Sequence, residues 1–335
     1  MMKTSSKMLF MMMTIISTII VISSSNWLNM WMGMEINLMS FIPLTFKSKN
    51  NFLSQSSMMY FLIQSMASTI FIIIILMYKY MFINMNNTSI MKIIIMITMM
   101  MKMGMPPLHM WFPEMMSKIS WNMCVMLMTW QKIAPMYILS LIMENNKLMM
   151  MMIMLSTIMG AILGLNHTSI RKIMAYSSIN HVGWMMAAAM INKKLWMMYM
   201  MLYSLMIIPM CMNLSKYNIM YINQFNIKSL SMTEKLSFMI MMMSMGGMPP
   251  FLGFMPKWMT IEYMIISNEM MMLTVMMLSS LITLSYYMRM ISSINMMMSN
   301  SQKWVILNKT NKMSTTNMLY INMMFPLFML LMNFM

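Results

Sequence analysis

The stretch GMPPLHMWFPE (104–114) returns later in the chain as GMPPFLGFMPK (247–257). Both copies read Gly-Met-Pro-Pro, then five residues, then a proline and a charged residue, and they lie 143 positions apart (247 − 104 = 143). A double proline removes two backbone donors and bends or interrupts a helix. We therefore expect two helices that are broken in the same way, one in each half of an internal repeat. The alternative is a pair of ordinary proline kinks.

Apolar sequence surrounds both copies. Of the 335 residues, 60% are hydrophobic and only 8% are charged, and the mean hydropathy is +0.69. A soluble domain of this length needs more charge to cover its surface, and a membrane β-barrel would show short segments of alternating polarity. Apolar segments long enough for a bilayer crossing recur instead from end to end. The sequence predicts an all-α polytopic membrane protein.

We expect about eleven transmembrane helices in a single integral membrane domain that covers residues 1–335. The repeat halves are predicted at roughly 26–145 and 148–291, followed by a polar link at 292–316 and a C-terminal helix at about 317–334. Interrupted helices at corresponding positions of two halves are typical of transporters with a site near the membrane midplane. The predicted segments are 8–24, 26–46, 57–78, 89–118, 121–141, 148–166, 169–190, 195–215, 236–267, 270–291 and 317–334.

Four ionisable residues are predicted inside the membrane. Glu35 and Lys132 lie near the middle of their segments, whereas Lys102 precedes the first break and Lys257 follows the second. A charge at the bilayer centre costs on the order of 2.5–3.5 kcal/mol on insertion scales, so such residues usually face the bundle interior and mark ion or proton routes. For Lys102 and Lys257, the alternative is a side chain that extends from a helix end to the membrane surface.

The types of these residues favour protons over sodium ions. A buried ammonium group loses hydration, which favours the neutral amine, whereas an opposed carboxylate favours the charged form. We expect Glu35 to partner Lys102, so that separating the two drives a proton toward the next lysine. A sodium site needs several oxygen ligands, and the chain has six Glu and no Asp. The sequence therefore predicts proton transfer along a chain of Glu and Lys side chains.

Further candidate relay groups lie in RKIMAYSSINHVGW (171–184) and beside the first break. Ser177, Ser178 and His181 are predicted to bind water inside the bundle and pass protons along. The alternative is helix packing, in which small residues allow close approach and the histidine bonds to a backbone carbonyl. His109, in PPLHMWFPE, has the same two interpretations.

Charge and cysteine content exclude several other functions. The formal net charge is +16, but most lysines lie between apolar segments, where they suit anionic lipid headgroups, so we expect no nucleic-acid partner. Cys124 and Cys211 are the two cysteines, which is too few for an iron–sulfur cluster, and no zinc-ligand spacing or phosphate loop is present. We predict that this chain holds no cofactor and no metal. If the protein belongs to a redox enzyme, its redox centres are expected in partner subunits.

Methionine usage indicates the origin of the gene. The chain holds 76 Met residues and few Gly, as expected for an AT-rich gene read with a code in which ATA means Met. Such codes belong to animal mitochondria. The N-terminal MMKTSSK leads directly into an apolar segment without an Arg-rich transit peptide, so we expect a mitochondrially encoded, multi-pass protein of the inner membrane.

The chain resembles the subunit 2 family of NADH dehydrogenase (ubiquinone), antiporter-like membrane subunits of mitochondrial respiratory complex I, in an invertebrate-type version. The resemblance rests on GMEINLMSFIPL (33–44), KMGMPPLHMWFPE (102–114), TWQKIAP (129–135), RKIMAYSSINHVGWM (171–185) and GGMPPFLGFMPKW (246–258). It implies eleven helices in two inverted halves. It also implies partnership with the other membrane and peripheral subunits, where flavin, iron–sulfur clusters and ubiquinone are expected.

The resemblance further implies proton pumping driven by electron transfer in those other subunits. By motif position, Lys102 matches the first channel lysine of the family, and Glu35 matches the glutamate that partners it. Lys132 matches the central lysine, and Lys257 matches the lysine of the exit side. The chain is thus expected to be part of an enzyme, NADH:ubiquinone reductase, without a redox centre of its own. The alternatives are an independent cation/proton antiporter of the same fold and a structural membrane scaffold.

Overall fold

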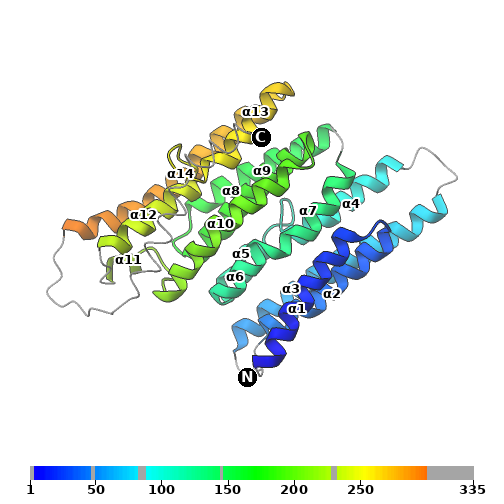
Figure 1. Cartoon of the computed structure of the whole chain (residues 1–335), viewed down its shortest axis with the longest axis horizontal. Helices are drawn as coiled ribbons and strands as arrows, with labels where there is room; N and C mark the ends of the chain where they lie inside the picture. Colours follow the sequence, from blue (N-terminus) through cyan, green and yellow to red (C-terminus); the bar gives the residue numbers. More distant parts are fainter. Residues whose placement is uncertain (1–3, 47–49, 82–87, 144–145, 228–231, 300–335) are drawn as a thin grey trace. The chain divides into compact units, whose positions relative to one another are not determined.

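The computed structural model describes residues 4–46, 50–81, 88–143, 146–227 and 232–299 (Figure 1). The chain divides into two compact units, Met1–Asn145 and Asn146–Met335. Each unit is described by itself.

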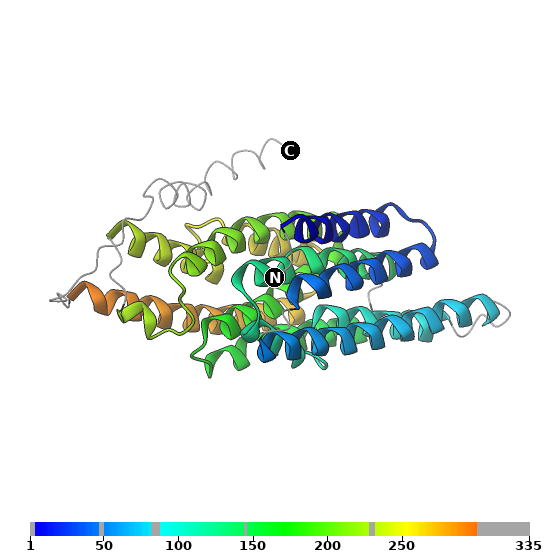
Figure 2. The same ribbon diagram turned by 90° about the horizontal axis from the view of Figure 1, so that it is seen from below.

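The first unit is a bundle of helices in which α2 packs against both α1 and α3, and α4 packs against α3 and α7 (Figures 1 and 2). Gly33 of α2 allows close approach to α1, because a Cβ atom there would lie 2.6 Å from Val21 Cγ2. The helices are α1 (Thr4–Ser23), α2 (Trp27–Thr45), α3 (Asn51–Met81), α4 (Thr88–Met103), α5 (Trp111–Lys118), α6 (Trp121–Met128) and α7 (Trp130–Ile142).

The second unit is built around α9, which contacts α8, α10, α13 and α14 and is buried along most of its length. Glycines bring α8 and α9 together: a Cβ atom on Gly160 would lie 2.8 Å from the Asn180 backbone nitrogen, and one on Gly183 would lie 2.5 Å from Ser156 Oγ. The helices are α8 (Lys147–Leu165), α9 (Ile170–Ile191), α10 (Leu195–Lys216), α11 (Gln224–Ile227), α12 (Met232–Gly246), α13 (Phe254–Ile266) and α14 (Met270–Ser299).

Each Gly-Met-Pro-Pro stretch lies between two helices, α4 and α5 in the first unit and α12 and α13 in the second. Gly104 and Gly247 adopt positive φ angles, +71° and +78°. In both breaks the glycine N–H donates to the carbonyl oxygen three residues earlier, at 3.2 Å in the first break and 3.0 Å in the second. The N–H of the following methionine donates to the carbonyl oxygen five residues before it, at 3.0 Å and 3.2 Å respectively. This is the Schellman helix ending, which a left-handed glycine completes. The glycine therefore ends each helix, and the two prolines that follow prevent its continuation.

The helical membrane fold is confirmed. Six described helical segments are long and apolar enough to cross a membrane, and the predicted count of eleven stays a prediction. Ten predicted segments coincide with one helix or a pair of helices, and the predicted helix at 317–334 lies outside the described residues. The qualifying segments are Ser5–Ser23, Asn51–Met77, Trp121–Ile142, Lys147–Leu165, Leu195–Lys216 and Met270–Asn295.

Several helix boundaries differ from the prediction. The segment predicted at 57–78 is longer, because α3 spans Asn51–Met81. The segment predicted at 121–141 is divided at Thr129, whose φ and ψ are −109° and −72°. The link predicted to begin at 292 begins later, because α14 continues to Ser299. Ile294 is buried in that extension, so tertiary packing extends the helix through a segment whose polar composition suggested a loop.

Candidate functional site

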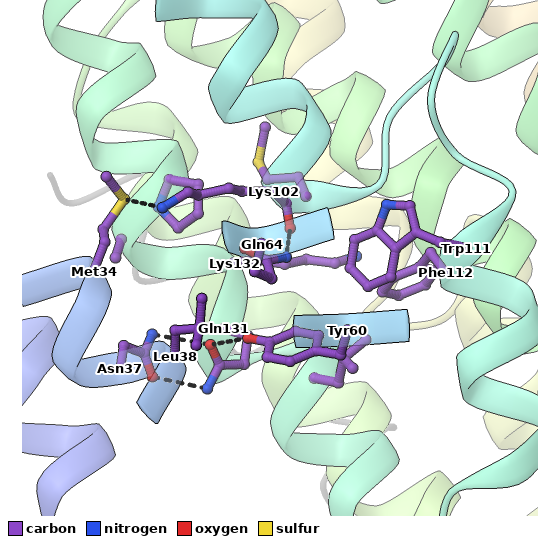
Figure 3. Close-up of a pocket in the computed structure, with 14 residues that line it drawn as sticks. Met34, Asn37, Leu38, Tyr60, Gln64, Lys102, Trp111, Phe112, Gln131 and Lys132 are labelled. Atoms are coloured by element: carbon purple, nitrogen blue, oxygen red, sulfur yellow. Dashed lines mark hydrogen bonds between the residues drawn. The ribbon is translucent and has the colours of Figure 1, made fainter. Parts of the chain in front are cut away.

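A polar cavity lies inside the first unit, where four helices contribute its polar side chains (Figure 3). Its volume open to water is about 20 Å³, which is enough for about one water molecule. Two of the predicted site residues, Lys102 and Lys132, line this one cavity. The polar lining residues are Asn37 of α2, Tyr60 and Gln64 of α3, Lys102 of α4, and Gln131 and Lys132 of α7.

Neutral hydrogen bonds hold the cavity walls together. Asn37 and Gln131 exchange two side-chain hydrogen bonds of 2.9 Å each, which join α2 to α7 (Figure 3). The Tyr60 hydroxyl donates to the same Gln131 oxygen at 3.3 Å. Gln64 Nε2 donates to the Lys102 carbonyl oxygen at 3.0 Å, which joins α3 to the last turn of α4. Buried polar groups that are satisfied in this way fix the helices in one register.

Lys102 is buried and its ammonium group points at α2. Lys102 Nζ donates to Met34 Sδ at 3.6 Å (Figure 3). Glu35, the next residue, is half-buried and lies close enough to Lys102 for an electrostatic interaction between the two charges. The direct contact of the ammonium group is thus a soft sulfur atom, and the carboxylate acts on it from further away.

Lys132 is the most buried of the candidate lysines, with 2% of its surface exposed. It lies in the first turn of α7, directly after the bend at Thr129, whose hydroxyl donates to the Val125 carbonyl oxygen at 2.8 Å. Lys132 Nζ lies over the Phe112 ring, 5.2 Å from its centroid. Phe112 comes from α5, so the first break brings an aromatic face to the central lysine.

Lys257 lies in the first turn of α13 in the second unit and is also buried. Its ammonium group donates to the Gly246 carbonyl oxygen at 2.9 Å and lies 5.8 Å from the centroid of the Trp184 ring. Gly246 is the last residue of α12, where carbonyl groups without helical partners and the negative end of the helix dipole favour a cation. The second break therefore holds a lysine against the end of its own interrupted helix.

His181 lies in an aromatic environment within the second unit. His181 Nδ1 is 2.9 Å from the Tyr199 hydroxyl, and its ring centroid is 4.9 Å from that of Tyr203. Ser177 and Ser178 donate to backbone carbonyl oxygens of their own helix, at 2.9 Å and 2.7 Å. The partner of His181 Nδ1 is therefore a phenol of α10.

His109 lies within the first break and is buried. Its Nδ1 atom is 3.3 Å from the Pro107 carbonyl oxygen, and its Nε2 atom has no hydrogen-bond partner in the part of the chain that the structure describes. The peptide bond between Pro106 and Pro107 is cis. These contacts are consistent with both sequence interpretations of His109.

The predicted residues thus form two groups, each within one unit. Glu35, Lys102 and Lys132 surround or adjoin the cavity of the first unit, whereas Lys257 and His181 belong to the second. Sequence reasoning missed the neutral polar groups and the two aromatic rings. Asn37 and Gln131 carried a usable signal, since an amide inside an apolar segment needs a partner. Among the described residues, no group of three or more His, Cys, Asp or Glu side chains lies close enough to hold a metal ion.

Comparisons with known proteins cover nearly the whole chain. The family model described as NADH:quinone oxidoreductase/Mrp antiporter, TM, matches residues 24–283. NADH-ubiquinone oxidoreductase chain 2 of Anopheles gambiae is 43% identical over 326 residues and 95% of each chain, and that of Locusta migratoria is 42% identical over 92% of this chain and 91% of its own. A chain of respiratory complex I from Thermus thermophilus has the same fold, with a TM-score of 0.81 at 17% identity, over 94% of this chain and 76% of its own.

Proposed function

Because the chain belongs to the NADH-ubiquinone oxidoreductase chain 2 family, we propose that it translocates protons as a membrane subunit of that enzyme. Electron transfer in partner subunits supplies the driving force, and this chain supplies part of the proton path. The proposal rests on the observation that Lys102 and Lys132 line the same buried polar cavity. Buried amines of this kind are costly to keep and serve proton relays.

Each residue has a distinct role in the proposed path. Glu35 favours the charged form of Lys102, and its movement would release a proton from Lys102 into the cavity. Lys132 receives that proton, with one water as the bridging group. Lys257 in the second unit serves the exit side, where the end of α12 stabilises its charged form. His181, His109, Ser177 and Ser178 are proposed relay groups between these lysines and water.

The cavity lining argues against sodium exchange. Its polar groups are two ammonium groups, three amides and a phenol, without a carboxylate. Sodium requires several oxygen ligands and is repelled by ammonium groups, whereas amines exchange protons readily. An independent cation/proton antiporter therefore fits the site less well. A passive scaffold would gain nothing from charges whose burial costs this much.

We place the protein in the mitochondrial inner membrane as a mitochondrially encoded, multi-pass subunit. The names of its relatives and the Met-rich composition support this location. The partners are the remaining membrane and peripheral subunits, which would hold the flavin, iron–sulfur clusters and ubiquinone. Lysines at helix ends, such as Lys118 and Lys216, suit anionic lipid headgroups at the membrane surface.

Lys132→Met tests the proposed function. Methionine has an unbranched side chain of similar length to lysine but carries no exchangeable proton. The number of protons moved per electron should therefore fall. The measurement is NADH-driven proton uptake by the whole complex in proteoliposomes, with electron transfer recorded in parallel.

Lys118→Met is the matched control, because this half-buried lysine lies at the end of α5 and does not line the cavity. It should leave the ratio of protons to electrons unchanged. An unchanged ratio in the Lys132 variant would overturn the proposal. Sodium–proton exchange by the purified chain without redox partners would instead establish the antiporter.

A further inference from the structure

Two of the buried lysines have an aromatic ring beside the ammonium group. The distances from Nζ to the ring centroid are 5.2 Å for Lys132 and Phe112 and 5.8 Å for Lys257 and Trp184. All four side chains are at most 4% exposed. A cation within about 6 Å of a ring centroid is attracted by the ring quadrupole, most strongly where water is excluded. The neutral amine lacks this attraction, so the ring distinguishes the two protonation states of the lysine.

The first break fixes the position of Phe112. Gly104 leaves room for it, since a Cβ atom on Gly104 would lie 2.7 Å from Phe112 Cβ and 3.1 Å from its Cγ. Trp111 packs edge-on against the same ring, with the two centroids 5.7 Å apart. Gly104 and Trp111 therefore both constrain the ring, and Lys132 Nζ lies over it. Such fixed packing is what a precise contact with a reacting group requires.

We propose that Phe112 is a positioning residue that stabilises the charged form of Lys132 and links its protonation to the backbone of the first break. The inference rests on the proposed function, because it assumes that Lys132 carries protons. When Lys132 loses its proton, the attraction between its amine and the Phe112 ring ends. The ring is then held less firmly against Gly104. In the second unit Trp184 of α9 likewise lies beside the ammonium group of Lys257, but there the lysine and not the ring belongs to the break.

Among the described residues, three other ionisable side chains line or adjoin the cavity beside Lys132. Tyr60 of α3 and Lys102 of α4 line the same cavity, and Glu35 of α2 lies beside its wall. The neighbouring helices α1 and α6 contribute no ionisable side chain to the lining. Lys102 carries the same charge as Lys132 and opposes its protonation, so an attractive group is needed on another side. The Phe112 ring supplies that attraction.

Phe112→Leu removes the ring and keeps an apolar side chain at this position. In the assembled complex, the alkaline limb of the pH profile of pumping should move to lower pH by about one unit, because the charged form of Lys132 is less stable. The measurement is the ratio of protons to electrons in proteoliposomes as a function of pH. Phe112→Tyr, which retains the ring, should keep the limb near its original position.

Phe71→Leu is the control for lost aromatic packing, because Phe71 is buried in the same unit and does not line the cavity. It should leave the pH profile unchanged. If the leucine variant does not assemble, Phe112→Met replaces it, since methionine stands at the corresponding position, 255, of the second break.

The possible outcomes separate the two proposals. Full pumping with an unmoved alkaline limb in the leucine or methionine variant overturns the role of Phe112 and leaves the proposed function intact. Full pumping by Lys132→Met overturns the proposed function itself. An equal shift in Phe71→Leu would trace the effect to packing and would also overturn the role of Phe112.

Discussion

The two breaks share a helix ending and differ in chemistry. Both end a helix with a left-handed glycine, and both continue with methionine and two prolines. At the eleventh position, however, the first break carries Glu114, which is exposed, and the second carries Lys257, which is buried. A repeated sequence therefore supplies the same helix ending twice, and single substitutions decide which copy places a charge inside the protein.

The contacts of the two glycines differ in a related way. Gly104 makes room for the Phe112 side chain, whereas Gly247 makes room for Lys257, whose Nζ would lie 2.6 Å from a Cβ atom there. In the first break the glycine positions an aromatic ring that in turn contacts a lysine. In the second break it contacts the lysine directly. The first arrangement adds one side chain between backbone and charge.

Removing the charge at the eleventh position of each break should give the largest difference. Lys257→Met should lower the number of protons moved per electron as strongly as Lys132→Met does, because a buried proton carrier is lost. Glu114→Gln should leave the ratio unchanged, since this side chain is exposed and does not line the cavity. Both variants are measured in proteoliposomes at one pH. A greater loss with Glu114→Gln would reverse the assignment of the two breaks.

Adding a methyl group to either glycine should give an intermediate effect. Gly104→Ala and Gly247→Ala each force a non-glycine residue into the left-handed region, at a cost of about 1–2 kcal/mol, in addition to the steric conflict. The thermal stability of the assembled complex should fall for both. Pumping per assembled complex should fall further for Gly247→Ala, because its methyl group would displace the ammonium group of Lys257 itself.

Gly246→Ala provides the matched control, one residue away. Its Cβ atom would meet Leu284 Cδ1 at 3.6 Å, an ordinary contact, and the position has no positive φ. Alanine favours the helix by about 0.5–1 kcal/mol over glycine, so this variant should be as stable as the parent or slightly more stable. Equal losses at 246 and 247 would show that space at the end of α12, and not the backbone conformation, limits the second break.

Part of this comparison could be predicted from sequence. The repeated Gly-Met-Pro-Pro located both breaks, and charges inside apolar segments located four buried or half-buried ionisable side chains. The Schellman endings were also accessible, because glycine followed closely by proline is their usual signature. Local patterns of this kind suffice where a feature depends on residues that are near in sequence.

Features that depend on distant residues could not be predicted in the same way. The Asn37–Gln131 pair joins residues 94 positions apart, and its existence depends on how α2 and α7 are rotated about their axes. Phe112 was one of 15 phenylalanines, and nothing local marked it as the partner of Lys132. The bend at Thr129 could not be predicted locally, because no glycine or proline lies within four residues of it. Packing decides these features, and a single sequence gives no direct access to packing.

The smallest expected effect concerns a helix ending of another type. Whereas α4 and α12 are closed by backbone groups, α8 is closed by a side chain from α14. Arg289 donates to the carbonyl oxygens of Leu165 and His167 at 2.6 Å each. A cation at a helix C-terminus is favourable, and the effect is modest where the group is exposed to solvent, as Arg289 is. Arg289→Gln should therefore lower the thermal stability slightly and leave pumping unchanged.

The same substitution has a predictable effect on His167. Burial, and next the charges of Lys172 and Arg289, lower the pKa of His167. A lowered pKa in the folded state contributes stability above the ordinary pKa, and this contribution is lost as the pH falls. Removing one cation should bring the pKa of His167 closer to its ordinary value. Stability should then change less on acidification in Arg289→Gln than in the parent, as thermal denaturation at several pH values would measure. An unchanged or steeper loss in the variant would contradict the assigned effect of the Arg289 charge on His167.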